Sequence, residues 1–138
     1  MRFHISLIRF GRALQIIALA TLTYHICIMV GIVPYELVWG GKLESRDQMF
    51  VFESISIAVN LLLIASVWAY FHAYPPSYHK AGRILMWIFG VLFALNTLGN
   101  IFAENIWEAV IFTPITAISA FLAFKLALHR EKKKENET

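Results

Sequence analysis

Four apolar stretches, each about as long as a membrane-spanning helix, constrain this chain more than any other feature. They cover about residues 13–33, 49–71, 84–103 and 107–128. A helix needs about 20 apolar residues to cross the hydrocarbon core of a bilayer. No stretch alternates strongly enough to form strands of a membrane barrel. The sequence therefore predicts an all-α, integral membrane four-helix bundle.

The composition points the same way. Of the 138 residues, 59% are hydrophobic and 15% are charged. A small soluble domain buries a comparatively small share of its surface, so it could not hide this much apolar material, whereas a bilayer accepts it as an apolar solvent. We expect one domain of four transmembrane helices over residues 1–130 and a charged cytoplasmic tail over residues 131–138.

Helix-breaking residues separate the four stretches. Pro34 cannot continue the first helix, and the pair Gly40–Gly41 interrupts any regular element after it. Pro75 and Pro76 end the second helix. Residues 104–106 are all that separates the third and fourth stretches, which predicts a tight antiparallel hairpin.

The basic residues predict the orientation of the bundle. Ten of the 12 lysines and arginines lie in the N-terminal segment, between the second and third stretches, or at the C-terminal end. Lys42 and Arg46 alone lie on the opposite side. Short cytoplasmic segments carry the excess of lysine and arginine in membrane proteins. We therefore expect both termini in the cytoplasm, a topology written N-in/C-in.

The cysteine and histidine residues of the sequence give little indication of a metal or cofactor site. Cys27 is the single cysteine, so no thiolate cluster can form. His25 is predicted near the outer face, while the other four histidines (His4, His72, His79 and His129) are predicted near the inner face. We therefore expect no two histidines to meet across the core at one depth and hold a haem. A surface metal site among the four inner histidines is the alternative to the interpretation that we favour, in which they are ordinary interfacial residues. We expect no cofactor, and the sequence contains no nucleotide-binding loop or catalytic triad.

Polar side chains gather at one depth, in the outer half of the predicted membrane. Every helix contributes some, while the inner half is almost wholly apolar. Polar groups inside a membrane usually face the bundle interior and often mark function. The candidate ligand-binding residues are His25, Glu53, Ser56, Asn60, Asn96, Asn100, Glu104 and Thr113.

Two interpretations of this polar belt remain open. In one, the side chains hydrogen-bond one another and hold the helices together, with Glu53 either protonated or paired to His25 or to an asparagine amide. In the other, they line a cavity open to the outside. Glu53 and His25 would then handle protons, Asn96 and Asn100 would orient a polar head group, and Thr113, with Glu104, would line the mouth.

Several short motifs resemble those of a family of small bacterial four-helix membrane proteins of unassigned function. They are Pro34-Tyr35-Glu36-Leu37-Val38-Trp39-Gly40-Gly41-Lys42-Leu43, Val51-Phe52-Glu53, Leu95-Asn96-Thr97-Leu98-Gly99-Asn100 and Phe112-Thr113-Pro114. This resemblance spans residues 23–127 and implies a multi-pass protein of the bacterial inner membrane. In layout alone, Glu53 with Asn96 or Asn100 is also similar to the emopamil-binding and sigma-2-receptor group, whose intramembrane pockets take sterol-like amphiphiles.

Three functions follow as hypotheses, and the sequence leaves open whether the protein is an enzyme. The first is a membrane protein whose polar pocket binds a small amphiphilic ligand. The second is a structural or accessory subunit of a membrane complex, with the belt as internal glue. The third is a dimeric proton-coupled transporter. The expected partners are membrane lipid, a small amphiphile, and a second copy or a partner membrane protein, but no nucleic acid.

Overall fold

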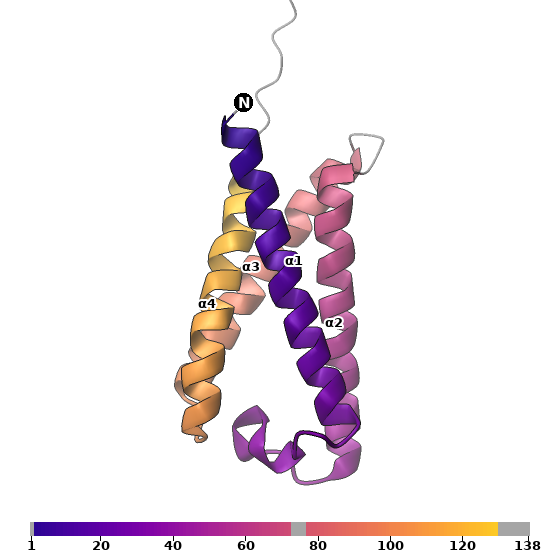
Figure 1. The fold of residues 1–138 in the computed structure, drawn as a ribbon, viewed down its shortest axis with the longest axis vertical. Helices are drawn as coiled ribbons and strands as arrows, with labels where there is room; N and C mark the ends of the chain where they lie inside the picture. The colour runs from indigo at the N-terminus through magenta and orange to yellow at the C-terminus, as the bar shows by residue number, and fades with distance from the viewer. Residues whose placement is uncertain (1, 73–76, 130–138) are drawn as a thin grey trace, which may run out of the picture.

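The computed structural model describes residues 2–72 and 77–129, and this part of the chain is almost entirely helical. Four long helices run along one axis (Figure 1). Two short 3-10 helices lie in the loop between the first two. The elements are α1 (Arg2–Met29), η1 (Tyr35–Leu37), η2 (Trp39–Gly41), α2 (Arg46–His72), α3 (Ser77–Ile101) and α4 (Ile106–Leu128).

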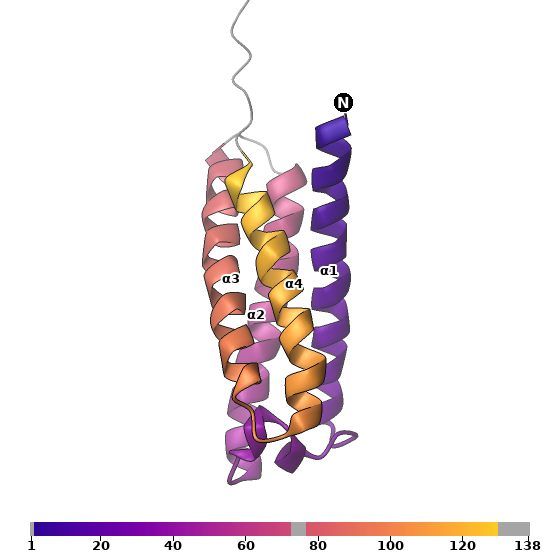
Figure 2. The same ribbon diagram turned by 90° about the vertical axis from the view of Figure 1, so that its left-hand side faces the viewer.

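The helices alternate in direction, so each one is antiparallel to the next. α3 packs closely on α4 and α1 packs closely on α2, while α4 also contacts α1 and α2 contacts α3. Figure 2 shows α4 lying between α1 and α3. The described ends of the chain lie together at one end of the bundle, and the loop carrying η1 and η2 lies at the other (Figure 1).

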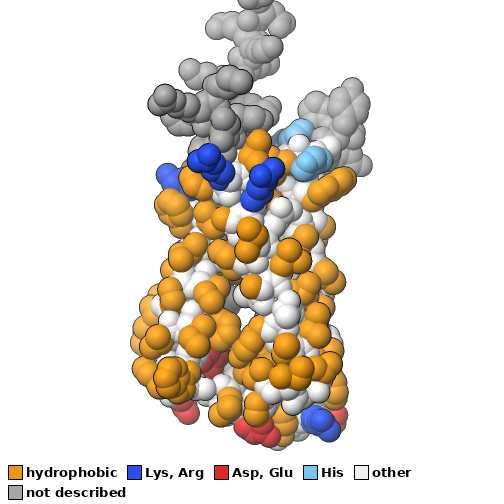
Figure 3. Space-filling model, in the orientation of Figure 1, with side chains coloured by type: hydrophobic (Ala, Val, Ile, Leu, Met, Phe, Trp, Pro, Cys, Tyr) orange, Lys and Arg blue, Asp and Glu red, His pale blue; other side chains and the backbone are white. Residues whose placement is uncertain are grey.

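All four helices are long and apolar enough to cross a membrane. Their outer surfaces are strongly apolar, as Ile16 (67% exposed) and Phe121 (55% exposed) illustrate. In Figure 3, hydrophobic side chains cover the visible flank, basic groups gather at the end that holds the termini, and acidic groups gather near the loop end. A bilayer would remove this apolar surface from water, as the prediction of a multi-pass bundle requires.

The interior of the bundle is a narrow column of interlocking apolar side chains. Leu14, Leu63, Met86 and Leu126, one from each helix, are completely or almost completely buried in one cluster. This column occupies the half of the bundle nearer the termini. The polar groups lie in the other half, nearer the loop that carries η1 and η2.

The first helix is longer at its start and shorter at its end than predicted. Residues 3–10 belong to α1, which runs without a break from Arg2. Its C-terminus is Met29 rather than Val33, because Gly31 adopts a φ of 81° that ends the helix. The Ile32 N–H bonds to the Cys27 carbonyl and the Gly31 N–H to the Ile28 carbonyl, which is the Schellman arrangement of a glycine-capped helix.

The other three helices also begin before their predicted starts. α2 begins at Arg46, three residues before the predicted start, and α3 begins at Ser77 rather than near residue 84. The first turns of α3 are polar, so hydropathy alone did not include them. Pro75 and Pro76, and the predicted tail over residues 131–138, lie outside the described residues.

Candidate functional site

The loop between α1 and α2 folds back across the open end of the bundle (Figure 1). Three consecutive residues make this turn with positive φ values: Trp39 (57°), Gly40 (69°) and Gly41 (72°). Glycine adopts such angles without steric cost, whereas a residue with a side chain pays roughly 1–2 kcal/mol for them. Trp39 is held there by the contacts of its indole ring.

Glu53, on the second turn of α2, connects the loop to α1. The Trp39 Nε1–H donates a hydrogen bond of 2.8 Å to Glu53 Oε1, and His25 Nδ1 lies 2.6 Å from Glu53 Oε2. The Glu53 side chain is wholly buried. Because both carboxylate oxygens have partners, the cost of burying this group is offset by two strong hydrogen bonds.

A second pair of hydrogen bonds joins the loop to the start of α4. The Gly40 N–H donates to Glu108 Oε2 over 2.7 Å, and Asn105 Nδ2 donates to the Leu37 carbonyl over 2.8 Å. Asn105 also caps α4, since its Oδ1 accepts the Trp107 N–H. The loop is therefore a strap, formed by residues 34–43, that is fastened to α2 and to α4.

Further polar contacts connect neighbouring helices behind the strap. Thr21 Oγ1 on α1 donates to Asn60 Oδ1 on α2 over 2.7 Å. On the other side, Thr97 of α3 donates to the hydroxyl of Thr116 on α4 over 3.0 Å, and Asn100 Nδ2 donates to the same hydroxyl over 3.3 Å. These hydrogen bonds connect α1 to α2 and α3 to α4.

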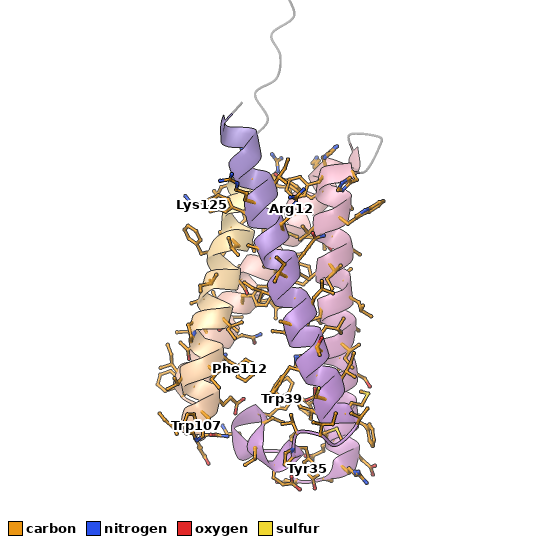
Figure 4. All side chains as sticks on the ribbon, viewed as in Figure 1. Arg12, Tyr35, Trp39, Trp107, Phe112 and Lys125 are labelled. Carbon is orange, nitrogen blue, oxygen red and sulfur yellow. The ribbon has the colours of Figure 1, made fainter. Side chains whose placement is uncertain are left out.

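A cavity of about 260 Å³ lies between the four helices and the strap. Every helix contributes a polar residue to its wall, and apolar side chains such as Phe89 and Phe93 complete the wall toward the core. Val38 and Trp39 line it from the strap. Figure 4 shows Trp39 and Phe112 directed into the space that the strap, α1 and α4 surround.

Five of the eight predicted site residues line this cavity. They are His25, Ser56, Asn60, Asn96 and Asn100. Among them, Asn96 is exposed and has no hydrogen-bond partner within residues 2–72 and 77–129, so its amide is free to meet a ligand. The structure thus brings together the residues that the polar pattern places at one depth.

The remaining three predicted residues take other positions. Glu53 lies behind the wall and reaches the cavity through its partners His25 and Trp39. Glu104 lies in a groove between α1 and α4, described below. Thr113 lines neither space; its Oγ1 is buried and has no hydrogen-bond partner within the part of the chain that the structure describes.

Several residues that shape the cavity were not predicted. They include Tyr24, Trp39, Glu108 and Thr116. Glu108 offered a signal, because it is an acidic residue one position after the predicted start of the fourth stretch. Trp39 offered none, because no periodicity indicates that a loop folds back between helices.

A groove of about 860 Å³ runs beside the cavity, between α1, the strap and α4. We call it the α1–α4 groove. Tyr24, Glu108 and Phe112 belong to the walls of both spaces. The rings of Tyr24 and Phe112 lie 4.9 Å apart, centroid to centroid, and so bridge α1 and α4 between the groove and the cavity.

Comparisons with known protein families, with curated proteins and with solved structures find no match to this chain. The geometry of the cavity and its surroundings therefore carries the functional argument. Within residues 2–72 and 77–129, no three histidine, cysteine, aspartate or glutamate side chains gather into a group that could hold a metal ion.

Proposed function

We propose that this protein is a multi-pass membrane protein that binds a small amphiphilic ligand in the cavity between its helices. The observation that carries the proposal is the wall of that cavity, where polar groups from all four helices converge among aromatic and aliphatic side chains. Small-molecule sites share this composition: a mostly apolar pocket with a few polar groups that orient the ligand. The volume, about 260 Å³, suits a small molecule or the head of a larger one.

The orientation forms part of the same proposal. We place both termini in the cytoplasm and the strap on the outer side, because the basic end of the bundle is the end that holds the termini. The motifs that resemble small bacterial membrane proteins favour the inner membrane of a bacterium. The cavity then lies in the outer half of the bilayer, with the strap between it and the aqueous phase.

Within this function, Glu53 is a positioning residue. Both of its oxygens are occupied by His25 and Trp39, so it shapes the wall without facing the ligand. We assign ligand contact to Asn96, whose amide is unpaired within the described residues, and to Ser56, which lines the same cavity.

One observation favours a second candidate function, that of a structural or accessory subunit. The bonds among Trp39, Glu53 and His25, and that between Thr21 and Asn60, are made within the protein itself. Such bonds hold helices together whether or not a ligand is present. In that case the free Asn96 amide would have no ligand to bind.

Asn96→Leu separates the two candidates, because it removes a polar group that makes no internal hydrogen bond. Thr23→Val is the matched control: Thr23 is exposed, bonds to its own helix at the Leu19 carbonyl, and lines neither space. The purified proteins are heated with and without a membrane lipid extract. We expect the extract to raise the Tm of the wild type and of Thr23→Val, but not that of Asn96→Leu.

The molecule responsible is then identified by mass spectrometry of the wild type after mild washing. An extract that changes no Tm, together with a washed protein that carries no small molecule, would contradict the ligand-binding function. Recovery of a stoichiometric partner protein under those same conditions would establish the accessory subunit instead.

A further inference from the structure

The α1–α4 groove is larger than the cavity, and the proposed cavity ligand does not account for it. Its walls are Ile17 and Ala20 on α1 and Ile111 and Ile115 on α4, with Leu37 of the strap at one end. In Figure 3 the flank is hollowed between the two helices, with acidic atoms visible inside. Since both helices are long enough to span a membrane, the groove would open toward lipid tails.

The polar part of the groove is acidic. Glu36, Glu104 and Glu108 line its strap end, and no lysine or arginine is part of its described wall. Lys42 lies beside Gly40, but its side chain is exposed and does not line the groove. A phosphate or carboxylate head group would find repulsion here, whereas a cation would find attraction.

Glu108 is the carboxylate best placed to receive that cation. It is half-buried and lies on the walls of both the groove and the cavity. Its Oε2 accepts the Gly40 N–H, and its Oε1 accepts no hydrogen bond from residues 2–72 or 77–129. The aromatic rings of Tyr24 and Phe112 stand beside it, and such rings attract cations across their faces.

We propose that the α1–α4 groove binds an amphiphile with an alkyl chain and an ammonium head group. The chain lies along the apolar walls of α1 and α4, and the ammonium group donates a hydrogen bond to Glu108 Oε1. The Tyr24–Phe112 pair closes the passage to the cavity. This proposal goes beyond the proposed function, because it assigns the groove a ligand of its own and names the charge of that ligand.

The test uses the full chain in phosphatidylcholine nanodiscs and three probes of one chain length: dodecylamine, dodecanol and dodecyl phosphate. Ala20→Trp fills the groove, since Ala20 is exposed and lines it. Ala65→Trp is the matched control, because Ala65 is exposed on α2 and lines neither space. Glu108→Gln removes the charge with little change of shape. Binding is measured by native mass spectrometry, and the fold is monitored by the Tm.

We expect the wild type to bind dodecylamine at least tenfold more tightly than dodecanol or dodecyl phosphate. Ala20→Trp should lose this binding while Ala65→Trp retains it, and Glu108→Gln should lose the preference for the amine. Glu36→Gln, a change at the exposed rim of the groove, should retain most of this preference and is the charge control. Should Glu108→Gln fail to fold, the probe comparison in the wild type and the loss of binding in Ala20→Trp still decide the proposal.

Equal binding of the three probes, or undiminished binding by Ala20→Trp, would overturn the proposal. Its failure is distinguishable from that of the proposed function. If the three probes bind equally while the lipid extract stabilises the wild type but not Asn96→Leu, the cavity binds a ligand and the groove does not. If dodecylamine binds in the groove while the extract stabilises no variant, the proposed groove site is supported and the proposed cavity function is contradicted.

Discussion

The indole N–H of Trp39 and the carboxylate of Glu53 form a hydrogen bond of 2.8 Å that fastens the strap to α2. Trp39 belongs to a loop and adopts a positive φ, while Glu53 is wholly buried in a helix. The strained residue is therefore held by a carboxylate that itself needs a donor. One hydrogen bond therefore supplies the buried carboxylate with a donor and holds Trp39 in its left-handed conformation.

Trp39→Phe keeps an aromatic ring but removes the N–H donor. Glu53 Oε1 then loses its partner in a buried setting, so we expect the free energy of unfolding to fall by about 1–3 kcal/mol. Amide hydrogen exchange should accelerate over residues 38–42. Trp107→Phe is the control, because Trp107 is 72% exposed and its change should leave both quantities nearly unaltered. Unchanged exchange in Trp39→Phe would show that the strap is held by other contacts.

The His25–Glu53 pair should show strong coupling in a double-mutant cycle. Either His25→Leu or Glu53→Leu alone leaves a polar group without its partner, whereas the double variant removes both. We expect the destabilisation of the double variant to be smaller than the sum of the single effects by about 1–3 kcal/mol. Reversible unfolding in mixed micelles measures it. A cycle of His25→Leu with Ser66→Ala, far along α2, should couple by less than about 0.5 kcal/mol.

Two glycines of α3 should respond to alanine in opposite directions. A Cβ at Gly90 would come within 2.5 Å of the Phe124 ring on α4, while a Cβ at Gly99 would meet nothing within 4 Å. We expect Gly90→Ala to destabilise the fold by about 1–3 kcal/mol and Gly99→Ala to stabilise it by about 0.5–1 kcal/mol. A loss of equal size at both positions would refute the close α3–α4 approach at Gly90.

Gly31 should be required at the end of α1. With a φ of 81°, Gly31→Ala forces a side chain into the left-handed region and should cost roughly 1–2 kcal/mol. Asparagine tolerates this region better, so Gly31→Asn should cost less. Thermal unfolding of the two variants gives the comparison. Equal Tm values for both variants and the wild type would argue against the capping arrangement.

The orientation can be tested with single cysteines in a Cys27→Ala background. Lys42 lies in the strap and Lys80 near the start of α3, and both are exposed. In whole cells we expect a membrane-impermeant maleimide to label Lys42→Cys but to label Lys80→Cys only after the membrane is permeabilised. The reverse pattern would place the termini outside, and equal labelling of both sites before permeabilisation would exclude a single orientation.

Hydropathy and helix-breaking residues predicted most of the fold. Length and apolarity are properties of the local sequence, so the four helices could be recognised, and the structure has four that are long and apolar enough to span a membrane. The predicted end at Val33 was wrong, because it took Pro34 as the residue that ends the helix and Gly31 ends it first. A glycine after an apolar run is itself a common end signal.

The candidate site was harder to predict, because a shared depth does not determine which side chains meet. His25 and Glu53 lie at matching depths and are paired. The polar pattern places Glu104 and Asn96 in the same belt. In the structure, Glu104 lies in the groove and Asn96 on the cavity wall. The strap was beyond sequence reasoning, since its position depends on contacts with Glu53 and Glu108 that arise only once the helices have assembled.

The strap also implies an order of events during synthesis. Its bonds to α4, from Gly40 to Glu108 and from Asn105 to Leu37, each join residues 68 positions apart. A nascent chain that has released only α1, α2 and α3 still lacks Asn105 and Glu108, which hold the strap on that side. The wall of the cavity at the strap is therefore complete only once the fourth helix has left the ribosome.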